Sequence, residues 1–179
     1  MILNAMPPTD RLHACAGCGL ELPGTGEPFD PRSTASVECR SVYGEVAGYE
    51  LQHVARLGRW HQLLVDTYGA QHVGERTPRI GPAFALIGLH LALEKGWAGP
   101  AVRDAHQALA RTRRDWPSFL PVPRFHGGLT VADLALAGSP EVHVEILGAW
   151  ASEVWAGWAD RQATVRSLVA TRLDLAPAR

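Results

Sequence analysis

The segment RWHQLLVDTYGAQHVGERTPRIGPAFALIGLHLALEKG, residues 59–96, decides the fold because it predicts two antiparallel helices joined by a short Gly/Pro turn. The first helix is expected from Arg59 to His72, where a nearby glycine offers a left-handed cap. The second is expected from Pro82, which suits a first helical turn, to a stop at Gly96. Its apolar run PAFALIGLHLAL is well short of the ~20 residues that span a bilayer, which indicates a buried helix.

Further helices are expected on both sides of this hairpin. The patterns place them over about 37–55, from Pro100 to just before Pro117, and from Thr130 to Gly138. No stretch shows the alternation expected of strands, so the sequence predicts an all-α helical bundle. Residues 1–37 are rich in Gly, Pro, Ser and Thr and predict an irregular metal-binding segment, which packs on the bundle of residues 38–179 within one domain.

The C-terminal helix begins with SPEV, in which Ser139 is the cap and Pro140 occupies the first turn. A continuous helix from Pro140 to Leu173 would measure about 50 Å at ~1.5 Å per residue. A compact chain of this length has a radius of gyration of roughly 16 Å. We therefore expect the helix to bend near Gly157 or to overhang the bundle. Its tryptophans are expected to serve packing.

The composition excludes several classes of function. The chain has 179 residues, 46% of them apolar, and a formal net charge of -1, so no global field favours nucleic acid or a membrane surface. Nucleic acid is therefore not an expected partner, and a homo-oligomer is compatible with the sequence. The first residues lack a secretory leader, which predicts a cytoplasmic protein. Motifs typical of P-loop, GxSxG and HExxH enzymes do not occur.

The motif CAGCG, residues 15–19, predicts a zinc knuckle. Cys15 and Cys18 are separated by two residues, and the adjacent glycines let both sulfurs reach one tetrahedral ion. Cys39 lies at the start of a predicted helix, where backbone amides favour the thiolate. Three cysteines are an odd number, which argues against a disulfide framework and for zinc binding or redox chemistry. Reactive thiols without a metal are the alternative interpretation.

A fourth zinc ligand is needed, and the candidates are Asp30, His13, His53 or a water molecule. Asp30 lies in the loop between the second and third cysteines, where closing the site costs little chain entropy. His13 is too close to Cys15 to fold back, and His53 is roughly 20 Å along the helix from Cys39. We therefore expect a site made of Cys15, Cys18, Asp30 and Cys39.

A second candidate site lies in the helical hairpin. Antiparallel packing about the turn places His61 level with Glu94, and His90 is one helical turn from Glu94. These three residues could hold a catalytic zinc or iron ion or act as a general acid and base. The stronger interpretation is a hydrogen-bond network inside the core, because buried polar side chains usually satisfy each other. Tyr68 shares the face of His61, and Tyr68 and His72 are the candidates for binding a ligand. His72 is also expected near the carbonyls that end its helix.

Several motifs resemble an uncharacterised bacterial family known only as a domain of unknown function. The resemblance rests on CAGCG, a later Cys before YGEVAGYE, WHQLLVDTYGAQHVG, GLHLALEKG, LTVADL and WASEVWAGWADRQATVRSLV, with the VDxYxxQH helix as its most specific part. It covers about Cys15 to Leu168. The family pattern usually has histidine at the position of Asp30, which implies a three-cysteine, one-histidine zinc site in which Asp30 is the substituted ligand. The resemblance implies no activity.

Two functions follow from these residues as expectations. The first is a zinc-stabilised helical bundle that acts as a binding or regulatory module, with a structural site of three cysteines and one aspartate. The second is a metal-dependent enzyme that uses His61, His90 and Glu94.

Overall fold

The computed structural model describes residues 11–112 and 115–172, and most of these residues are helical. The elements in chain order are β1 (Leu12–Ala14), β2 (Glu21–Pro23), α1 (Val37–Gln52), α2 (Val54–Leu57), α3 (His61–Gln71), α4 (Ile80–Leu93), α5 (Gly99–Thr112), α6 (Val131–Ala135), α7 (Pro140–Gly157) and α8 (Ala159–Arg172). The expected all-α bundle with an irregular N-terminal segment is confirmed.

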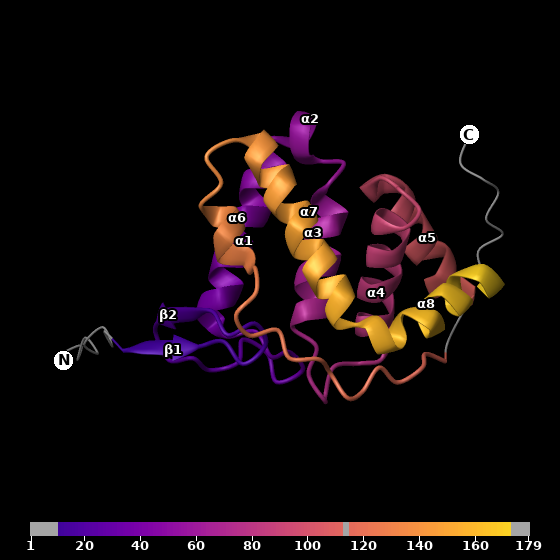
Figure 1. Ribbon diagram of the computed structural model, residues 1–179, viewed down its shortest axis with the longest axis horizontal. Coiled ribbons are helices and arrows are strands. Elements are labelled where there is room, and N and C mark those ends of the chain that lie inside the picture. The colour runs from indigo at the N-terminus through magenta and orange to yellow at the C-terminus, as the bar shows by residue number, and fades with distance from the viewer. Residues whose placement is uncertain (1–10, 113–114, 173–179) are drawn as a thin grey trace, which may run out of the picture.

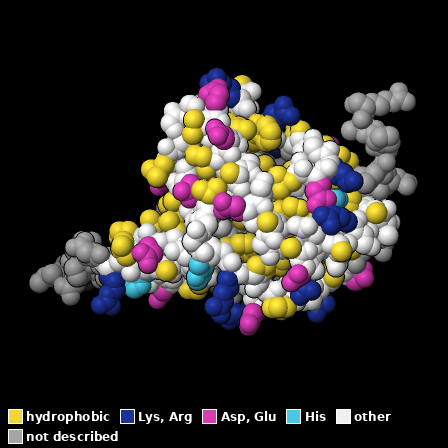
Figure 2. All heavy atoms as spheres, viewed as in Figure 1, with side chains coloured by type: hydrophobic (Ala, Val, Ile, Leu, Met, Phe, Trp, Pro, Cys, Tyr) yellow, Lys and Arg dark blue, Asp and Glu magenta, His cyan; other side chains and the backbone are white. Residues whose placement is uncertain are grey.

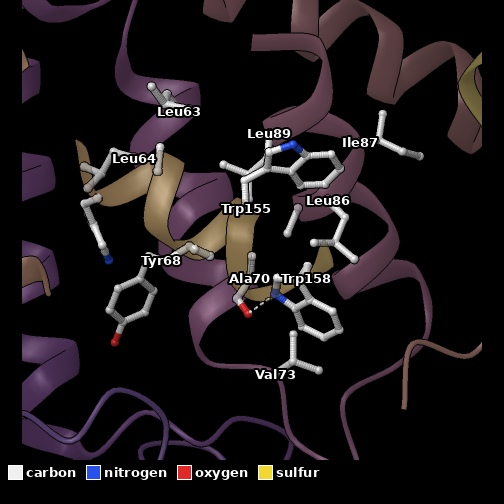
Figure 3. Packing of buried hydrophobic residues seen from close by; sticks show 14 of the residues in the cluster. Leu63, Leu64, Tyr68, Ala70, Val73, Leu86, Ile87, Leu89, Trp155 and Trp158 are labelled. Carbon is white, nitrogen blue, oxygen red and sulfur yellow. Dashed lines mark hydrogen bonds between the residues drawn. The ribbon is translucent and has the colours of Figure 1, made fainter. Parts of the chain in front are cut away.

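Helix α3 is the centre of the bundle. It packs against α4, α7, α5 and α1, while α8 packs on α4 and α6 packs on α1 (Figure 1). The core beside α3 is formed by apolar side chains from several helices, and the indole Nε1 of Trp158 donates a 3.2 Å hydrogen bond to the Ala70 carbonyl (Figure 3). Trp150 and Trp155 are also buried, as their predicted packing role requires.

Side-chain caps begin three of the helices. The Ser36 side chain accepts a hydrogen bond from the Cys39 amide at the start of α1, and the Ser139 side chain caps α7 as expected. Thr130 and Asp133 form a capping box at the start of α6. The C-terminal helix breaks at Trp158, one residue beyond the expected bend. A Cβ atom at Gly157 would lie 2.5 Å from the Phe125 ring, so glycine permits this close contact beside the break.

The expectation of no strands was wrong. The strands β1 and β2 form a small antiparallel sheet in which His13 pairs with Leu22 (lower left in Figure 1). Each strand has three residues, which is too short for an alternating pattern to be recognised. The expected helix over 37–55 is also divided, because α1 ends at Gln52 and α2 begins at Val54.

The surface carries both signs of charge. Figure 2 shows acidic and basic side chains scattered among apolar groups on one face, without a large region of a single sign. Within the described residues, no helix has both the length and the apolar content needed to cross a membrane.

Candidate metal centre

Four buried side chains form a group with the composition of a metal site. One ligand atom from each of Cys15, Cys18, Cys39 and His72 can be chosen so that all four lie within 4.8 Å of one another. Cys15 and Cys18 come from the turn between β1 and β2, Cys39 from the first turn of α1, and His72 from the end of α3. Among residues 11–112 and 115–172, no other group of three or more His, Cys, Asp or Glu residues meets this criterion.

The turn that carries the first two cysteines requires its glycines. The Cys15 amide donates to the Leu20 carbonyl at 2.8 Å, and the Gly19 amide donates back to the Cys15 carbonyl at 2.8 Å. Gly19 has a φ of 78°, a conformation that L side chains rarely adopt. At Gly17, a Cβ atom would lie 2.5 Å from the ring of His72, so this glycine allows the imidazole to approach the knuckle.

The imidazole of His72 is oriented for ligation. Its Nδ1 donates a 2.9 Å hydrogen bond to the Tyr68 carbonyl, which leaves the lone pair on Nε2. Nε2 lies 3.4 Å from the Cys39 sulfur. The predicted position of His72 near the carbonyls that end its helix is therefore confirmed. The opposite edge of the ring, which carries Nε2, points to the cysteines, and this contact with the cysteines was not expected.

The distances between donor atoms fit one tetrahedral ion. Two sulfurs bound at ~2.3 Å to a tetrahedral zinc ion stand about 3.8 Å apart, and a sulfur and an imidazole nitrogen about 3.6 Å apart. In the structure the sulfurs of Cys18 and Cys39 are 3.9 Å apart. The Cys39 sulfur and His72 Nε2 are 3.4 Å apart. The side chains therefore need little movement to bind an ion of this size.

The three thiols compete for ionisation when they are this close. Hydrogen bonds from the Cys18 and Cys39 side chains hold the pKa of the Cys15 thiol well below its ordinary value. The neighbouring Cys15 and Cys18 sulfurs, together with burial, raise the pKa of the Cys39 thiol. Without a metal ion, the favoured state therefore has one thiolate that accepts hydrogen bonds from the other two thiols. A divalent cation would supply the positive charge that stabilises three thiolates.

Groups around the donors hold them in place. The amide of Ser36 donates to the Cys15 sulfur at 3.4 Å, and the Tyr68 hydroxyl donates to the Cys39 sulfur at 3.7 Å. Burial raises the pKa of the Tyr68 hydroxyl, which keeps it a neutral donor. Tyr68, expected as a residue that could bind a ligand, thus contacts a member of the metal group.

Asp30, expected as the fourth ligand, is not part of the group. Its carboxylate accepts hydrogen bonds from the backbone amide of Arg32 at 2.7 Å and from the guanidinium of Arg32 at 2.9 Å. These bonds lower the pKa of the Asp30 carboxyl to about 2. His72 is instead the fourth member of the group. The Thr34 amide donates to the His72 carbonyl, and this bond holds the end of α3 next to the knuckle.

The three candidate residues His61, His90 and Glu94 do not form the single cluster expected from the hairpin, because His61 belongs to one hydrogen-bond network and His90 and Glu94 belong to another. His61 Nδ1 donates to Glu50 at 2.7 Å, and the other oxygen of this fully buried carboxylate accepts from His143 Nε2 at 2.8 Å. The geometry is that of a core hydrogen-bond network linking α1, α3 and α7.

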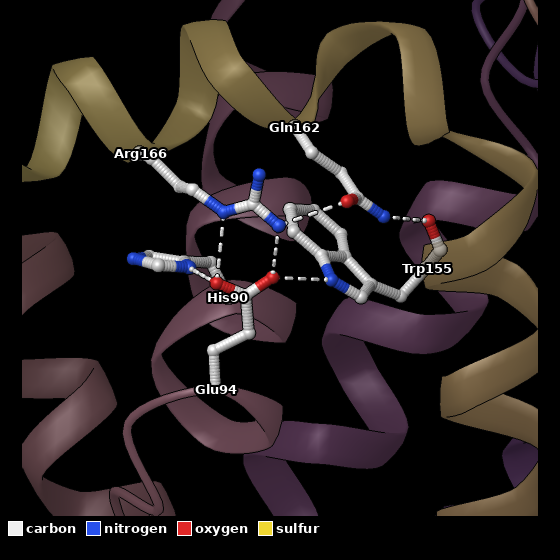
Figure 4. Close-up of polar contacts among 5 residues, drawn as sticks. All are labelled: His90, Glu94, Trp155, Gln162 and Arg166. Atoms are coloured by element: carbon white, nitrogen blue, oxygen red, sulfur yellow. Dashed lines mark hydrogen bonds and ion pairs between the residues drawn. The ribbon is translucent and has the colours of Figure 1, made fainter.

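His90 belongs to the second network, with Glu94 at its centre. His90 Nδ1 donates to Glu94 at 2.9 Å, Trp155 Nε1 donates at 3.0 Å, and Arg166 binds both carboxylate oxygens (Figure 4). The hydrogen bonds of Arg166 are the main reason that the pKa of Glu94 falls to about 2. This network fastens α8 to α4.

The comparisons with known proteins identify one family. The model of a family described as "Family of unknown function (DUF5946)" matches residues 13–159, a span that contains all four members of the metal group. The family-level resemblance inferred from the sequence motifs is confirmed. No curated protein and no solved structure matches the chain.

Proposed function

The chain belongs to this family of unknown function, and we propose that it is a zinc-stabilised helical binding module. In this proposal Cys15, Cys18, Cys39 and His72 hold one structural zinc ion. The observation that carries the proposal is the convergence of four buried donor atoms within 4.8 Å, from three separate parts of the chain.

The chemistry of the donors favours zinc over other metals. Thiolate and imidazole ligands in a tetrahedral arrangement are typical of zinc, whereas calcium and magnesium take oxygen ligands. Three sulfurs and one nitrogen complete four-coordination without a water molecule. A closed set of this kind is typical of structural zinc sites, because catalytic sites keep one position open.

The ion has a clear structural task in the N-terminal segment. Residues 11–36 contain two three-residue strands and otherwise irregular backbone. The buried apolar residues of this segment are Cys15, Cys18 and Ala35. So little apolar burial cannot order a segment of this length, and metal binding supplies the missing stabilisation. The alternative, a metal-dependent enzyme, has lost its geometric support because His61 and His90 lie in separate networks.

Metal analysis and hydrogen exchange test this proposal together. Protein purified under reducing conditions without chelator should contain about one zinc per chain by elemental mass spectrometry, and Cys18→Ser should lower that content strongly. After zinc removal by a chelator, the amides of Gly17, Gly19 and Thr34, each of which donates a backbone hydrogen bond in or beside the knuckle, should lose protection. Amides of α4 and α7 should keep theirs. Metal-free protein in which the knuckle amides stay protected would refute the structural role.

A further inference from the structure

A small cavity lies beside the first half of α3. Its volume is about 150 Å³, and it is lined by four residues between Arg59 and Asp66, by the end of α4, by the turn into α5 and by Gly148 of α7. His72 and the metal group are at the opposite end of α3 (Figure 1). At ~30 Å³ per water molecule the cavity holds about five waters, so it suits a ligand of a few heavy atoms.

The carboxyl group of Asp66 lines this cavity with one oxygen unused. Asp66 is 4% exposed, and its Oδ1 accepts a 3.0 Å hydrogen bond from Gln62 Nε2. Oδ2 has no hydrogen-bond or ion-pair partner in the part of the chain that the structure describes. The unpaired side-chain atoms that are sealed from solvent belong to other residues, namely Gln71, His106, His143 and Trp150. Oδ2 is therefore unpaired but still has surface that a ligand can touch.

The helix faces around Oδ2 show that this surface opens into the cavity. Oδ2 lies against Gly88 of α4, where a Cβ atom would overlap it. Leu63 is one turn before Asp66 on α3, and residues three or four apart share one face of a helix. Ala92 is one turn after Gly88 on α4. Because Leu63 and Ala92 both line the cavity, it follows the groove between α3 and α4 to the carboxyl group.

The Asp66 carboxyl group lacks a partner in either protonation state. Burial raises its pKa well above the ordinary value, and the hydrogen bond from Gln62 offsets this effect only in part. As a carboxylate, Oδ2 has no cation beside it, and as an acid its O–H has no acceptor. A buried ionisable group is normally paired, so the missing partner on a cavity wall indicates a ligand. A cation is the partner that would stabilise the carboxylate.

The rest of the lining suits a cation with an apolar chain. Trp60 and Trp97 are half-buried and line the cavity, and aromatic faces attract cations. The guanidinium carbon of Arg59 already lies 5.1 Å from the centroid of the Trp60 ring. Arg59 is exposed, so its charge stands at the mouth, where water and salt screen it. The other lining residues apart from Asp66 are uncharged.

We propose that this cavity binds a small primary alkylammonium ion, which donates to Asp66 Oδ2 and packs its alkyl chain against Leu63 and Trp97. A hydrogen bond between two charged groups is stronger than one between neutral groups, and here it is largely removed from water. The inference goes beyond the zinc proposal and does not depend on it, because no residue of the cavity lining belongs to the metal group.

Propylamine and 1-propanol provide a matched pair of probes. They have chains of equal length, and at pH 7 the amine is protonated, as a lysine side chain is. Each is titrated into the purified protein and followed by NMR through the indole N–H resonances of Trp60 and Trp97, with potassium chloride added to the propanol series to match the ionic strength. Propylammonium should shift both resonances in a saturable manner and should bind at least tenfold more tightly than propanol.

A charge variant tests the role of the carboxyl group. Asp66→Asn keeps the size of the side chain but removes its charge, so the preference for propylammonium should fall below twofold. Asp104→Asn is the control, because Asp104 is exposed on α5 and lies outside the cavity lining. It removes the same charge from the protein and should keep the wild-type preference.

A second pair of variants tests the cavity itself. Gly148 lines the cavity and has open space around its Cβ position, so Gly148→Leu should fold and weaken propylammonium binding at least fivefold. Gly44 of α1 also has open space but lies outside the lining, so Gly44→Leu should bind like the wild type. All variants are compared after thermal unfolding confirms that they are folded.

Three results would overturn the inference. They are equal affinity for the two probes at matched ionic strength, an undiminished preference for propylammonium in folded Asp66→Asn, and full propylammonium binding in folded Gly148→Leu. The zinc proposal fails by a different result, namely protein that contains no metal but keeps an ordered knuckle. Zinc content is therefore measured in the same samples.

Discussion

Replacing His72 tests the fourth position of the metal group. His72→Ala removes the Nε2 atom that lies 3.4 Å from the Cys39 sulfur, whereas Asp30→Ala removes a carboxylate that is bound to Arg32. His53→Ala is a matched control. His53 also ends a helix and bonds the carbonyl four residues earlier through Nδ1, at the same 2.9 Å, but it lies outside the metal group.

The expected loss of affinity follows from the number of donors. Structural zinc sites bind with about 10–16 kcal/mol, so each of four donors contributes about 2.5–4 kcal/mol if they share it equally. At about 1.4 kcal/mol for each factor of ten, His72→Ala should weaken zinc binding by about 10²–10³-fold. His53→Ala and Asp30→Ala should leave the affinity within about threefold of the wild type. The lost helix-end hydrogen bond should cost both histidine variants about 1 kcal/mol of stability.

Competition with a chromophoric zinc chelator at pH 7, under reducing conditions, measures these affinities. The result that would refute our assignment is a large loss in Asp30→Ala together with wild-type affinity in His72→Ala. An equal loss of zinc affinity in His53→Ala and His72→Ala would show that helix stability, and not ligation by His72, determines the affinity for zinc.

Other predictions concern the core. Burial lowers the pKa of His106 to about 4 from 6.5, so the stability present above pH 6.5 is lost as the pH falls toward 4. The free energy of unfolding, measured with urea, should therefore fall by about 2 kcal/mol more between pH 7 and pH 5 in the wild type than in His106→Phe. Gly88→Ala should destabilise the protein by about 1–3 kcal/mol in thermal unfolding, since its Cβ would clash with Asp66 Oδ2, whereas Gly148→Ala, with open space, should stabilise it by about 0.5–1 kcal/mol. Glu50→Gln should cost about 1–3 kcal/mol by urea unfolding, because one of its two histidine donors loses its acceptor.

The helices could be predicted from the sequence because their signals are local. The hairpin of α3 and α4, the capping box at Thr130 and the break after Gly157 each depend on residues within a few positions. The strands β1 and β2 could not be predicted, since their pairing depends on the knuckle turn that joins them. The three cysteines were identifiable from their spacing, and the structure brings their sulfurs together.

The fourth donor could not be predicted, because its position is a tertiary property. Loop entropy favoured Asp30, which is near in sequence, but His72 reaches the cysteines through the contact between Thr34 and the end of α3. The only sequence signal for His72 was its expected place at a helix end, where Nδ1 faces a carbonyl and Nε2 is left available to a metal. The hairpin cluster failed for a related reason: His61 faces Glu50 of α1, whereas His90 shares Glu94 with Arg166 of α8.

The order of the metal donors along the chain affects how the protein is made. All four precede α4, so a growing chain exposes the complete set before the helices α4 to α8 leave the ribosome. Under the zinc proposal, the ion is thus captured during synthesis, while α3 still lacks the neighbours that bury it. Translation in metal-depleted cells would then deliver chains in which residues 11–36 have no fixed arrangement when the remaining helices emerge.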